Sequence, residues 1–192
     1  MKNIGTIELE SNRLLFRKAS INDSKDMFNN WASDKEVTKY LSWDAYEKEE
    51  NAVSYLKYLE EEYIKDNFYN WIVVSKEDNT PIGTIGAVDI DIKNNTVEIG
   101  YCYGRKWWGK GLATESLKRV IKFFFEEVEV ETIYADHIDA NPASGKVMEK
   151  AGMKYEGIMR KRVLNKVTKK KADLIYYSIT KEDYFKGDNH EN

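Results

Sequence analysis

Three apolar stretches in the middle of the chain constrain the fold most strongly. They are Trp71–Ser75, Ile82–Asp91 and Thr96–Tyr103, and they are rich in the β-branched and aromatic residues that favour strands. Asp78-Asn79-Thr80-Pro81 and Asn94-Asn95 separate them with residues that favour turns. The three stretches therefore predict an antiparallel β-meander.

Two longer stretches predict amphipathic helices, because their apolar residues recur at three- and four-residue spacing. These stretches are Lys48–Lys65 and Leu112–Glu127. Asn141-Pro142 predicts the start of a third helix, because Asn caps free amides and Pro suits the first helical position, and Gly152 would end it. The other predicted elements are a strand at Leu14–Arg17, a short helix at Asn22–Trp31, a strand at Thr132–Ile138, and a hairpin of Tyr155–Leu164 and Lys170–Thr180 around Asn165-Lys166. We therefore expect a mixed α/β (α+β) fold with a mostly antiparallel, seven-stranded sheet flanked by helices.

Length and charge suit one globular domain, expected at residues 1–185 of the 192 and followed by a disordered polar tail at 186–192. The 30 Lys and Arg against 33 Asp and Glu give a formal charge of −3, so no global field favours nucleic acid or anionic lipid, and no specific DNA binding is expected. No segment approaches the roughly 20 apolar residues of a membrane span, and the first residues lack the apolar run of a secretory signal. Cys102 is the single cysteine and cannot form an intrachain disulfide, which agrees with a reducing interior, so a cytoplasmic location is expected. The protein is expected to be a monomer or a homodimer.

The segment from Gly104 to Glu115 joins a strand to a helix and carries glycines suited to phosphate binding. Gly109 and Gly111 have no Cβ to hold a phosphate away from the backbone, and the helix start leaves amides without internal partners. A pyrophosphate would meet both these donors and the positive end of the helix dipole. Gly111 also stands where a nucleoside-triphosphatase loop needs Ser or Thr for magnesium, and Thr114 where a dinucleotide fingerprint needs a third glycine. Glycines that serve only the geometry of the turn are the alternative.

Several motifs resemble those of the GNAT superfamily of N-acetyltransferases. Lys106-Trp107-Trp108-Gly109-Lys110-Gly111 is similar to its Gln/Arg-x-x-Gly-x-Gly/Ala pyrophosphate loop, with Lys106 as a departure from Gln or Arg, and Leu112-Ala113-Thr114-Glu115 resembles the helix start that follows. A second set of motifs resembles the pattern of the ribosomal-protein branch, the RimJ/RimL type. It consists of Asn141-Pro142-Ala143-Ser144, Val147-Met148-Glu149-Lys150-Ala151-Gly152-Met153, Tyr155-Glu156-Gly157 and Arg160. The resemblance covers about residues 8 to 180 and implies the GNAT acyl-CoA acyltransferase fold.

This resemblance implies acetyl-CoA (coenzyme A) as the acetyl donor and an amine as the acceptor. The loop and helix start would hold the pyrophosphate through Lys106, Trp108, Gly109, Lys110, Gly111, Leu112, Ala113 and Thr114. Backbone groups of Tyr101, Cys102 and Tyr103 would pair with the pantetheine arm as an added strand would, and Asn141 and Ser144 would also contact the cofactor. Independently of the resemblance, Gly100 inside a strand indicates a bulge or a close backbone approach.

Removal of the amine proton is the chemical requirement that points to Glu98. A protein α-amine, with a pKa of about 7.8, is partly neutral at pH 7, whereas a lysine at about 10.4 is almost wholly protonated. Period-two alternation puts Glu98, Gly100 and Cys102 on one face of the strand and Val97, Ile99 and Tyr101 on the other. The resemblance places Glu98 where several family members carry the glutamate that takes this proton through water. A structural glutamate paired with Arg, Lys or Tyr is the alternative.

Ser144 is the candidate group for hydrogen bonding to the leaving thiolate, because Met148 stands where many relatives have a tyrosine acid. A thiol has a pKa of about 8.5, so its thiolate needs less help from an acid than an alkoxide does. Ser144 could instead bond to the backbone in the first helical turn. Asn141 could cap the helix, orient the pantetheine, or both.

Four aromatic residues cluster around the link between the first two predicted helices: Trp31, Tyr40, Trp43 and Tyr46. In the resembling family this region helps to wall the acceptor pocket, so they would contact substrate, with core packing as the alternative. Seven of the twelve residues from Arg160 to Lys171 are basic, and they would either attract an acidic protein or ribosomal RNA or form a solvated hairpin. His137 has no second ligand at metal spacing, so a structural or surface histidine and no metal site are expected.

The first functional hypothesis is an N-acetyltransferase that transfers acetyl from acetyl-CoA directly to a protein N-terminal α-amine. One alternative is the same chemistry on a small-molecule amine such as a polyamine, an amino acid or an antibiotic. The other is a non-catalytic acyl-CoA-binding module.

Overall fold

The computed structural model describes residues 1–188 of the chain, whose strands form one sheet. The strands are β1 (Leu9–Glu10), β2 (Leu14–Arg17), β3 (Asn70–Ser75), β4 (Thr80–Asp91), β5 (Thr96–Tyr103), β6 (Thr132–Ile138), β7 (Lys154–Leu164) and β8 (Lys171–Thr180). Their order across the sheet is β1-β2-β3-β4-β5-β6-β8-β7, and each adjacent pair is antiparallel except β5 and β6. The predicted mixed, mostly antiparallel sheet is confirmed, with one strand more than expected because β1 is too short to show a period.

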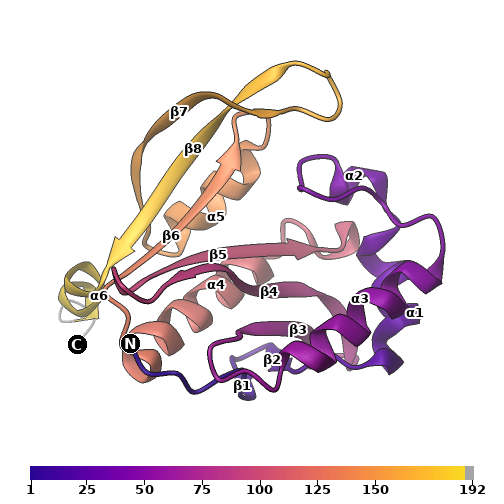
Figure 1. Cartoon of the computed structure of the whole chain (residues 1–192), viewed down its shortest axis with the longest axis horizontal. Helices are drawn as coiled ribbons and strands as arrows, with labels where there is room; N and C mark the ends of the chain where they lie inside the picture. The colour runs from indigo at the N-terminus through magenta and orange to yellow at the C-terminus, as the bar shows by residue number, and fades with distance from the viewer. Residues whose placement is uncertain (189–192) are drawn as a thin grey trace.

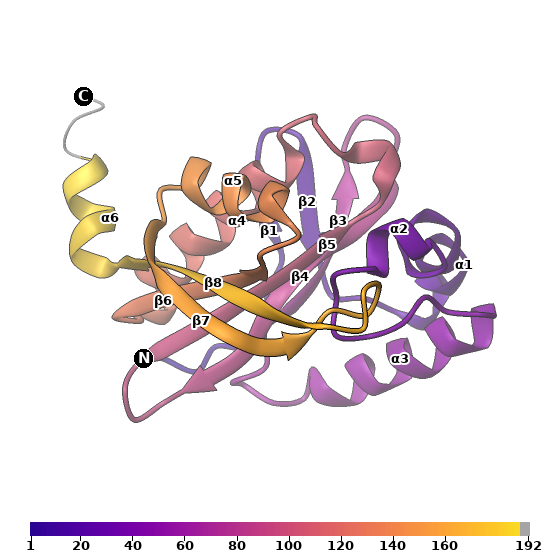
Figure 2. The ribbon, with the colours of Figure 1, turned by 90° about the horizontal axis from the view of Figure 1, so that it is seen from above.

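Helices cover both faces of this sheet (Figures 1 and 2). They are α1 (Ser24–Met27), α2 (Lys35–Thr38), α3 (Glu49–Glu62), α4 (Leu112–Phe123), α5 (Pro142–Lys150) and α6 (Lys181–Asp188). Figure 2 shows α4 and α5 on one side of the sheet and α1 to α3 on the other. On the side of α1 to α3, no described helix lies over β7 and β8 (Figure 2), and nearly all residues of β7 are exposed.

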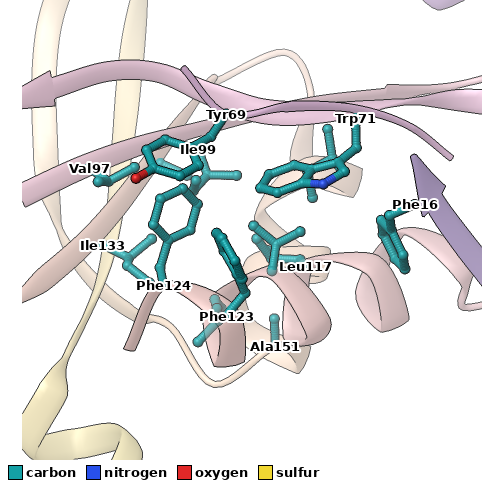
Figure 3. Close-up of a cluster of buried hydrophobic side chains, with 14 of the residues drawn as sticks. Phe16, Tyr69, Trp71, Val97, Ile99, Leu117, Phe123, Phe124, Ile133 and Ala151 are labelled. Carbon is teal, nitrogen blue, oxygen red and sulfur yellow. The ribbon is translucent and has the colours of Figure 1, made fainter. Parts of the chain in front are cut away.

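The larger core lies between the sheet and α4 (Figure 3). Tyr69, just before β3, and Trp71 of β3 pack against Phe123, the last residue of α4, and Phe124, the residue after it. The ring centroids are 5.4 Å apart for Trp71 and Phe123 and 5.1 Å apart for Tyr69 and Phe124. These pairs are edge-to-face, the arrangement that aromatic quadrupoles favour. This packing fixes the position of α4, whose other end begins at the glycine-rich loop.

Two predicted segments differ in detail from the structure. The helix expected at Asn22–Trp31 is a 3₁₀ turn, the single α turn α1 and a π-helical turn at Phe28–Ala32. The tail predicted to be disordered from Lys186 overlaps α6, which continues to Asp188, because α6 packs on β8. Residues 189–192 lie outside the described part of the chain.

Candidate active site

Strands β5 and β6 separate partway along their length. They pair in parallel only at Thr96 with Thr132, Val97 with Ile133 and Glu98 with Tyr134. Beyond Glu98, β5 remains paired with β4 and β6 with β8, but not with each other. The facing backbone groups of β5 from Ile99 onward are therefore unpaired by any described strand, and an extended molecule could bind there as an added strand.

A β-bulge lies where this separation begins. The register of β4 against β5 shifts between Ala87 and Asp89, which makes Val88 an extra residue. A Cβ on Gly100 would lie only 2.5 Å from the Val88 Cγ2 atom, so the glycine allows the bulged side chain to pack there. The prediction that Gly100 marks a bulge or close approach is confirmed. Bulges increase the local twist of a strand, which favours divergence of β5 from β6.

The glycine-rich loop at the start of α4 has the geometry of an anion site. Gly109 and Gly111 have φ values of 72° and 77°, the left-handed region that favours glycine. A Cβ on Gly109 would meet no protein atom within 4 Å, so the space beside it is open. The first amide to bond within the helix is that of Glu115, which donates to the carbonyl of Gly111. The amides of residues 112–114 are thus without helical partners at the positive end of the dipole.

An ion pair between Arg13 and Glu115 anchors this loop, and no sequence motif predicted it. The Arg13 Nε atom lies 2.6 Å from the Glu115 carboxylate, and its guanidinium also donates to the Lys110 carbonyl at 3.0 Å. Ser11 donates to the same carboxylate at 2.7 Å. Burial alone would raise the pKa of Glu115, but the hydrogen bonds from Ser11 and Arg13 outweigh it and hold that pKa below its usual value. These partners are about a hundred residues apart in sequence, so no local pattern could reveal them.

Tyr101 of β5 and Ser144 of α5 contact each other through hydrogen bonds. The Tyr101 hydroxyl lies 3.0 Å from the Ser144 Oγ atom and donates to the Ser144 carbonyl at 3.1 Å. Burial raises the pKa of the Tyr101 phenol to about 12, so it stays protonated. The structure therefore brings two predicted cofactor-binding residues together, and it shows a tyrosine hydroxyl beside Ser144 although Met148 replaces the tyrosine expected from the family.

Asn141 precedes α5, but its side chain makes no capping hydrogen bond. Asn141 occupies the N-cap position that was predicted, and the helix begins at Pro142 as expected, but the cap is made by its backbone carbonyl, which accepts from the Ser144 amide at 3.2 Å. Pro142 has no N–H in the first turn that would need an acceptor. The Asn141 side-chain amide remains available to a ligand.

Glu98 lies on the opposite face of β5 from Tyr101, as the alternation predicted. It is half-buried, and burial together with the nearby carboxylates of Asp136 and Asp89 raises its pKa, while a hydrogen bond from Tyr134 acts in the opposite direction. Among the described residues no Lys or Arg nitrogen lies within 4 Å of Glu98. The hydrogen bond from Tyr134 is the pairing with Tyr that the structural alternative named. Tyr134 and Asp136 were missed from the sequence, although they share a strand face and Tyr134 is in register with Glu98.

Of the aromatic residues expected to contact the acceptor, Trp31 does not. It is fully buried among Leu56, Leu59 and other residues beneath α3, because the π-helical turn directs it into the core. Tyr40 and Trp43 are partly exposed, and Trp43 packs against Tyr46 with ring centroids 5.3 Å apart.

The segment around Trp43 also touches the tip of the β7–β8 hairpin. Lys166 donates to the Trp43 carbonyl at 2.5 Å and forms an ion pair with Asp44 at 3.0 Å. In Figure 1 the connection between β7 and β8 extends toward α2, above β5. The 40–46 segment and the hairpin are therefore linked to each other on the approach to β5.

Other predicted residues have ordinary environments. Trp108 is 48% exposed and donates to the Tyr103 carbonyl at 2.7 Å, and the exposed Lys106 ammonium lies 5.1 Å from the centre of the Trp107 ring. Burial raises the pKa of the Cys102 thiol to about 11, so it is a neutral thiol.

His137 is buried, with Nδ1 2.9 Å from the Ile138 carbonyl, and its ring stacks on Tyr177, as expected of a structural histidine. In residues 1–188 no group of three His, Cys, Asp or Glu side chains is arranged to hold a metal ion. None of the helices described is long and apolar enough to cross a bilayer.

Comparison with known proteins gives the family. Residues 13–154 match the acetyltransferase (GNAT) domain model, and the chain belongs to this family. It is 29% identical over 176 residues to the uncharacterized N-acetyltransferase p20 of Bacillus licheniformis, covering 92% of this chain and 97% of that protein.

Two solved structures are similar along most of their length. One is a GNAT-family acetyltransferase from Bacillus anthracis, with a TM-score of 0.79, 27% identity and coverage of 92% of this chain and 99% of that one. The other, the ribosomal-protein-S5-alanine acetyltransferase of Vibrio fischeri, has a TM-score of 0.80 at 20% identity, covers 93% of this chain and 98% of that one, and shows the shared fold.

The protein is thus an N-acetyltransferase that uses acetyl-CoA, and its residues fit that cofactor. The open space beside Gly109 and the free amides at the start of α4 suit a diphosphate. The unpaired edge of β5 suits the amide-bearing pantetheine arm, and Ser144 lies where that edge approaches α5.

Proposed function

We propose that the acceptor is a protein N-terminal α-amine, as in the RimJ/RimL branch. The observation that carries this proposal concerns the sheet face that holds the half-buried Glu98. No described helix lies over β7 and β8 on that side (Figure 2), and the 40–46 segment and the β7–β8 hairpin are joined there through Lys166. An open face accommodates an extended polypeptide, whereas small-molecule sites bury most of their ligand in a concave pocket. The RimJ/RimL-like motifs around Ser144 and Gly157 support the same branch.

In this proposal Glu98 accepts the proton of the incoming amine. Its raised pKa makes it a stronger base than an ordinary glutamate. Acetyl-CoA, when bound, supplies the acetyl group as a thioester. The free amides of β5 beyond Ile99 would donate to the thioester carbonyl, where negative charge develops.

Ser144 would assist departure of the thiolate. In this step the Tyr101 hydroxyl donates to the Ser144 Oγ atom, which leaves the single Ser144 hydroxyl proton to be donated to sulfur. The two faces of β5 therefore have different roles in this proposal. Glu98 accepts the amine proton on one face, and Tyr101 and Ser144 assist departure of the thiolate on the face covered by α5.

An acceptor panel tests the proposal. Thiol release from acetyl-CoA is measured with short peptides that have a free N-terminus, with the same peptides N-formylated but carrying lysine, and with spermidine, free amino acids and an aminoglycoside. We expect turnover only with free peptide N-termini, and mass spectrometry should place the acetyl group on the first residue. Preference for a free small amine would contradict the proposal.

A polyamine is the second candidate acceptor, because Glu98, Asp136 and Asp89 lie close together and none of them forms an ion pair among the described residues. A cation with several ammonium groups would match these carboxylates. The spermidine arm of the same panel separates this candidate from the first. Binding of CoA without thiol release in any arm would instead favour a non-catalytic module.

A further inference from the structure

The charges of this chain are strongly segregated. Residues 160–171 hold seven of its 30 Lys and Arg side chains and no Asp or Glu, so the rest of the chain carries 23 basic against 33 acidic side chains. Residues 160–171 form the outer ends of β7 and β8 and the turn between them. We call residues 158–171 the basic hairpin.

A bulge presents three of these cations together. Met159 pairs with Leu174 and Val163 with Ala172, so residues 160–162 of β7 lie opposite a single residue of β8, Asp173. Lys161 adopts a left-handed φ of 52°, and its amide donates to the Asp173 carboxylate at 2.7 Å. All three basic side chains are exposed. Bulges commonly re-aim side chains beside active sites, and this one is held in place by a buttressing carboxylate.

Most cations of the basic hairpin also lack an ion-pair partner in the rest of the described chain. Of its seven basic residues only Lys166 forms an ion pair there, with Asp44. The apolar side chains of Ile158, Met159, Leu164 and Val167 are between 51% and 64% exposed on the same hairpin. Uncovered apolar side chains interleaved with free cations are typical of a surface that binds a partner.

Contacts link this surface to the surroundings of Glu98. At the tip of the hairpin, Lys166 donates a hydrogen bond to the Trp43 carbonyl of the 40–46 segment. Burial and the charge of Asp136 raise the pKa of Tyr176, and Arg162 is near enough to act on the same phenol in the opposite direction. Asp136 in turn acts on Glu98. A short series of neighbours therefore joins the basic hairpin to the proposed base.

We propose that the basic hairpin docks an acidic segment of the acceptor polypeptide, downstream of the amine that is acetylated. This inference rests on the proposed function. The acceptor would then present opposite charges to the two surfaces, with its ammonium at the carboxylates around Glu98 and its acidic side chains at Arg162 and the neighbouring cations. The exposed apolar residues favour a polypeptide over RNA, because a phosphodiester backbone offers them no apolar partner, and the carboxylates around Glu98 repel phosphates.

The test uses two labelled peptides with the same first three residues, one followed by four glutamates and one by four glutamines. Binding to the full-length protein in the presence of CoA is measured by fluorescence anisotropy at low and high salt. The hairpin variant is R162Q/K170Q, and the matched control is K57Q/K93Q, which removes two exposed cations without ion pairs from α3 and from the β4–β5 turn.

We expect the hairpin variant to bind the glutamate peptide about five- to tenfold more weakly at low salt, with little change for the glutamine peptide. The control variant should bind both peptides as the parent protein does. Equal weakening of both peptides, or the same loss in the control, would overturn the docking surface. Salt-dependent binding of a single-stranded RNA oligonucleotide by the hairpin, without preference for the glutamate peptide, would overturn it in favour of RNA.

Thiol release, measured in parallel, separates this inference from the proposed function. Turnover of both peptides with equal KM would support N-terminal acetylation and refute the docking surface. Charge-dependent binding that the hairpin variant loses, without turnover of any peptide, would support the docking surface and refute the proposed acceptor.

Discussion

At the scale of single residues, the raised pKa of Glu98 predicts how activity depends on pH if Glu98 is the base. A protonated Glu98 cannot accept the amine proton, so activity must fall as the pH drops through its pKa, which burial, Asp136 and Asp89 place above the ordinary value of 4.5. Glu98 takes up the proton that the ammonium releases, so the reacting pair must lose only one proton in total. Below the pKa of Glu98, the logarithm of kcat/KM should therefore fall with a slope of about 1.

Glu98→Gln should lower kcat by about a hundredfold or more, and kcat/KM of the variant should already fall below the pKa of the amine, so that the loss is largest in acid. CoA affinity should not change, because Glu98 lies on the face of β5 away from Tyr101 and Ser144. Measurement of kcat/KM against pH with a peptide acceptor checks both points. An identical pH profile in parent and variant would eliminate Glu98 as the base.

The hydrogen bond between Tyr101 and Ser144 predicts that their substitutions are not independent. Ser144→Ala should lower kcat about tenfold, because the thiolate is a good leaving group with or without a donor. Tyr101→Phe should lower kcat less in the parent protein and not at all in the Ser144→Ala background, since Tyr101 acts through Ser144. Acetyl-CoA KM values report any direct effect on the cofactor. Additive losses in the double variant would show that Tyr101 acts separately.

At the scale of elements, the loop before α4 depends on two left-handed glycines. Gly109→Ala should abolish most CoA affinity, because the new Cβ would project into the space beside the loop, where the diphosphate is expected. The matched control is Gly152→Ala after α5, which is also left-handed, at 95°, and also has room for a Cβ. Each substitution should cost about 1–2 kcal/mol of unfolding free energy, but only Gly109→Ala should weaken CoA binding, measured by calorimetry. Equal CoA affinity in the two variants would refute the loop assignment.

The elements that could be predicted from the sequence are those with a regular hydrophobic period. The helix α3 and the strands β3 to β5 have long, simple periods, and they were predicted to within a few residues. In contrast, Phe123, Phe124 and Phe125 are all buried although three successive residues of a regular helix point in different directions. A π-helical turn at Phe124–Val128 and the packing of Phe125 on Tyr184 of α6 accommodate them. The helix α6 escaped prediction because a tertiary contact, rather than a local period, defines its buried side.

At the scale of the whole molecule, the site combines segments that are far apart in sequence. The glycine loop, Glu98 and Ser144 could be predicted because each lies in a local motif on one strand or helix start. The carboxylates beside Glu98, the buried position of Trp31 and the clamp of Arg13 on Glu115 could not, because each depends on which strands become neighbours and which turns depart from regular geometry. Local chemistry was therefore predictable, and the contacts that tune or anchor it were not.

The clamp on Glu115 also couples the pyrophosphate loop to global stability. Because the folded-state pKa of Glu115 is lowered, its carboxylate stabilises the fold above the unfolded-state value near 4.5, and this contribution is lost as the pH falls through the lower folded-state value. Glu115→Gln should therefore reduce the free energy of unfolding by about 1 kcal/mol at pH 7 and by less in acid, measured by urea denaturation. The same variant should bind CoA more weakly, since Arg13 loses the partner that directs it to the Lys110 carbonyl. Lys76, whose exposed ion pair with Glu10 joins the same end of the sheet, supplies the control: Lys76→Gln should leave CoA affinity unchanged. If the two variants lost CoA affinity equally, the effect would belong to the sheet edge in general and the Arg13–Glu115 clamp would have no specific role.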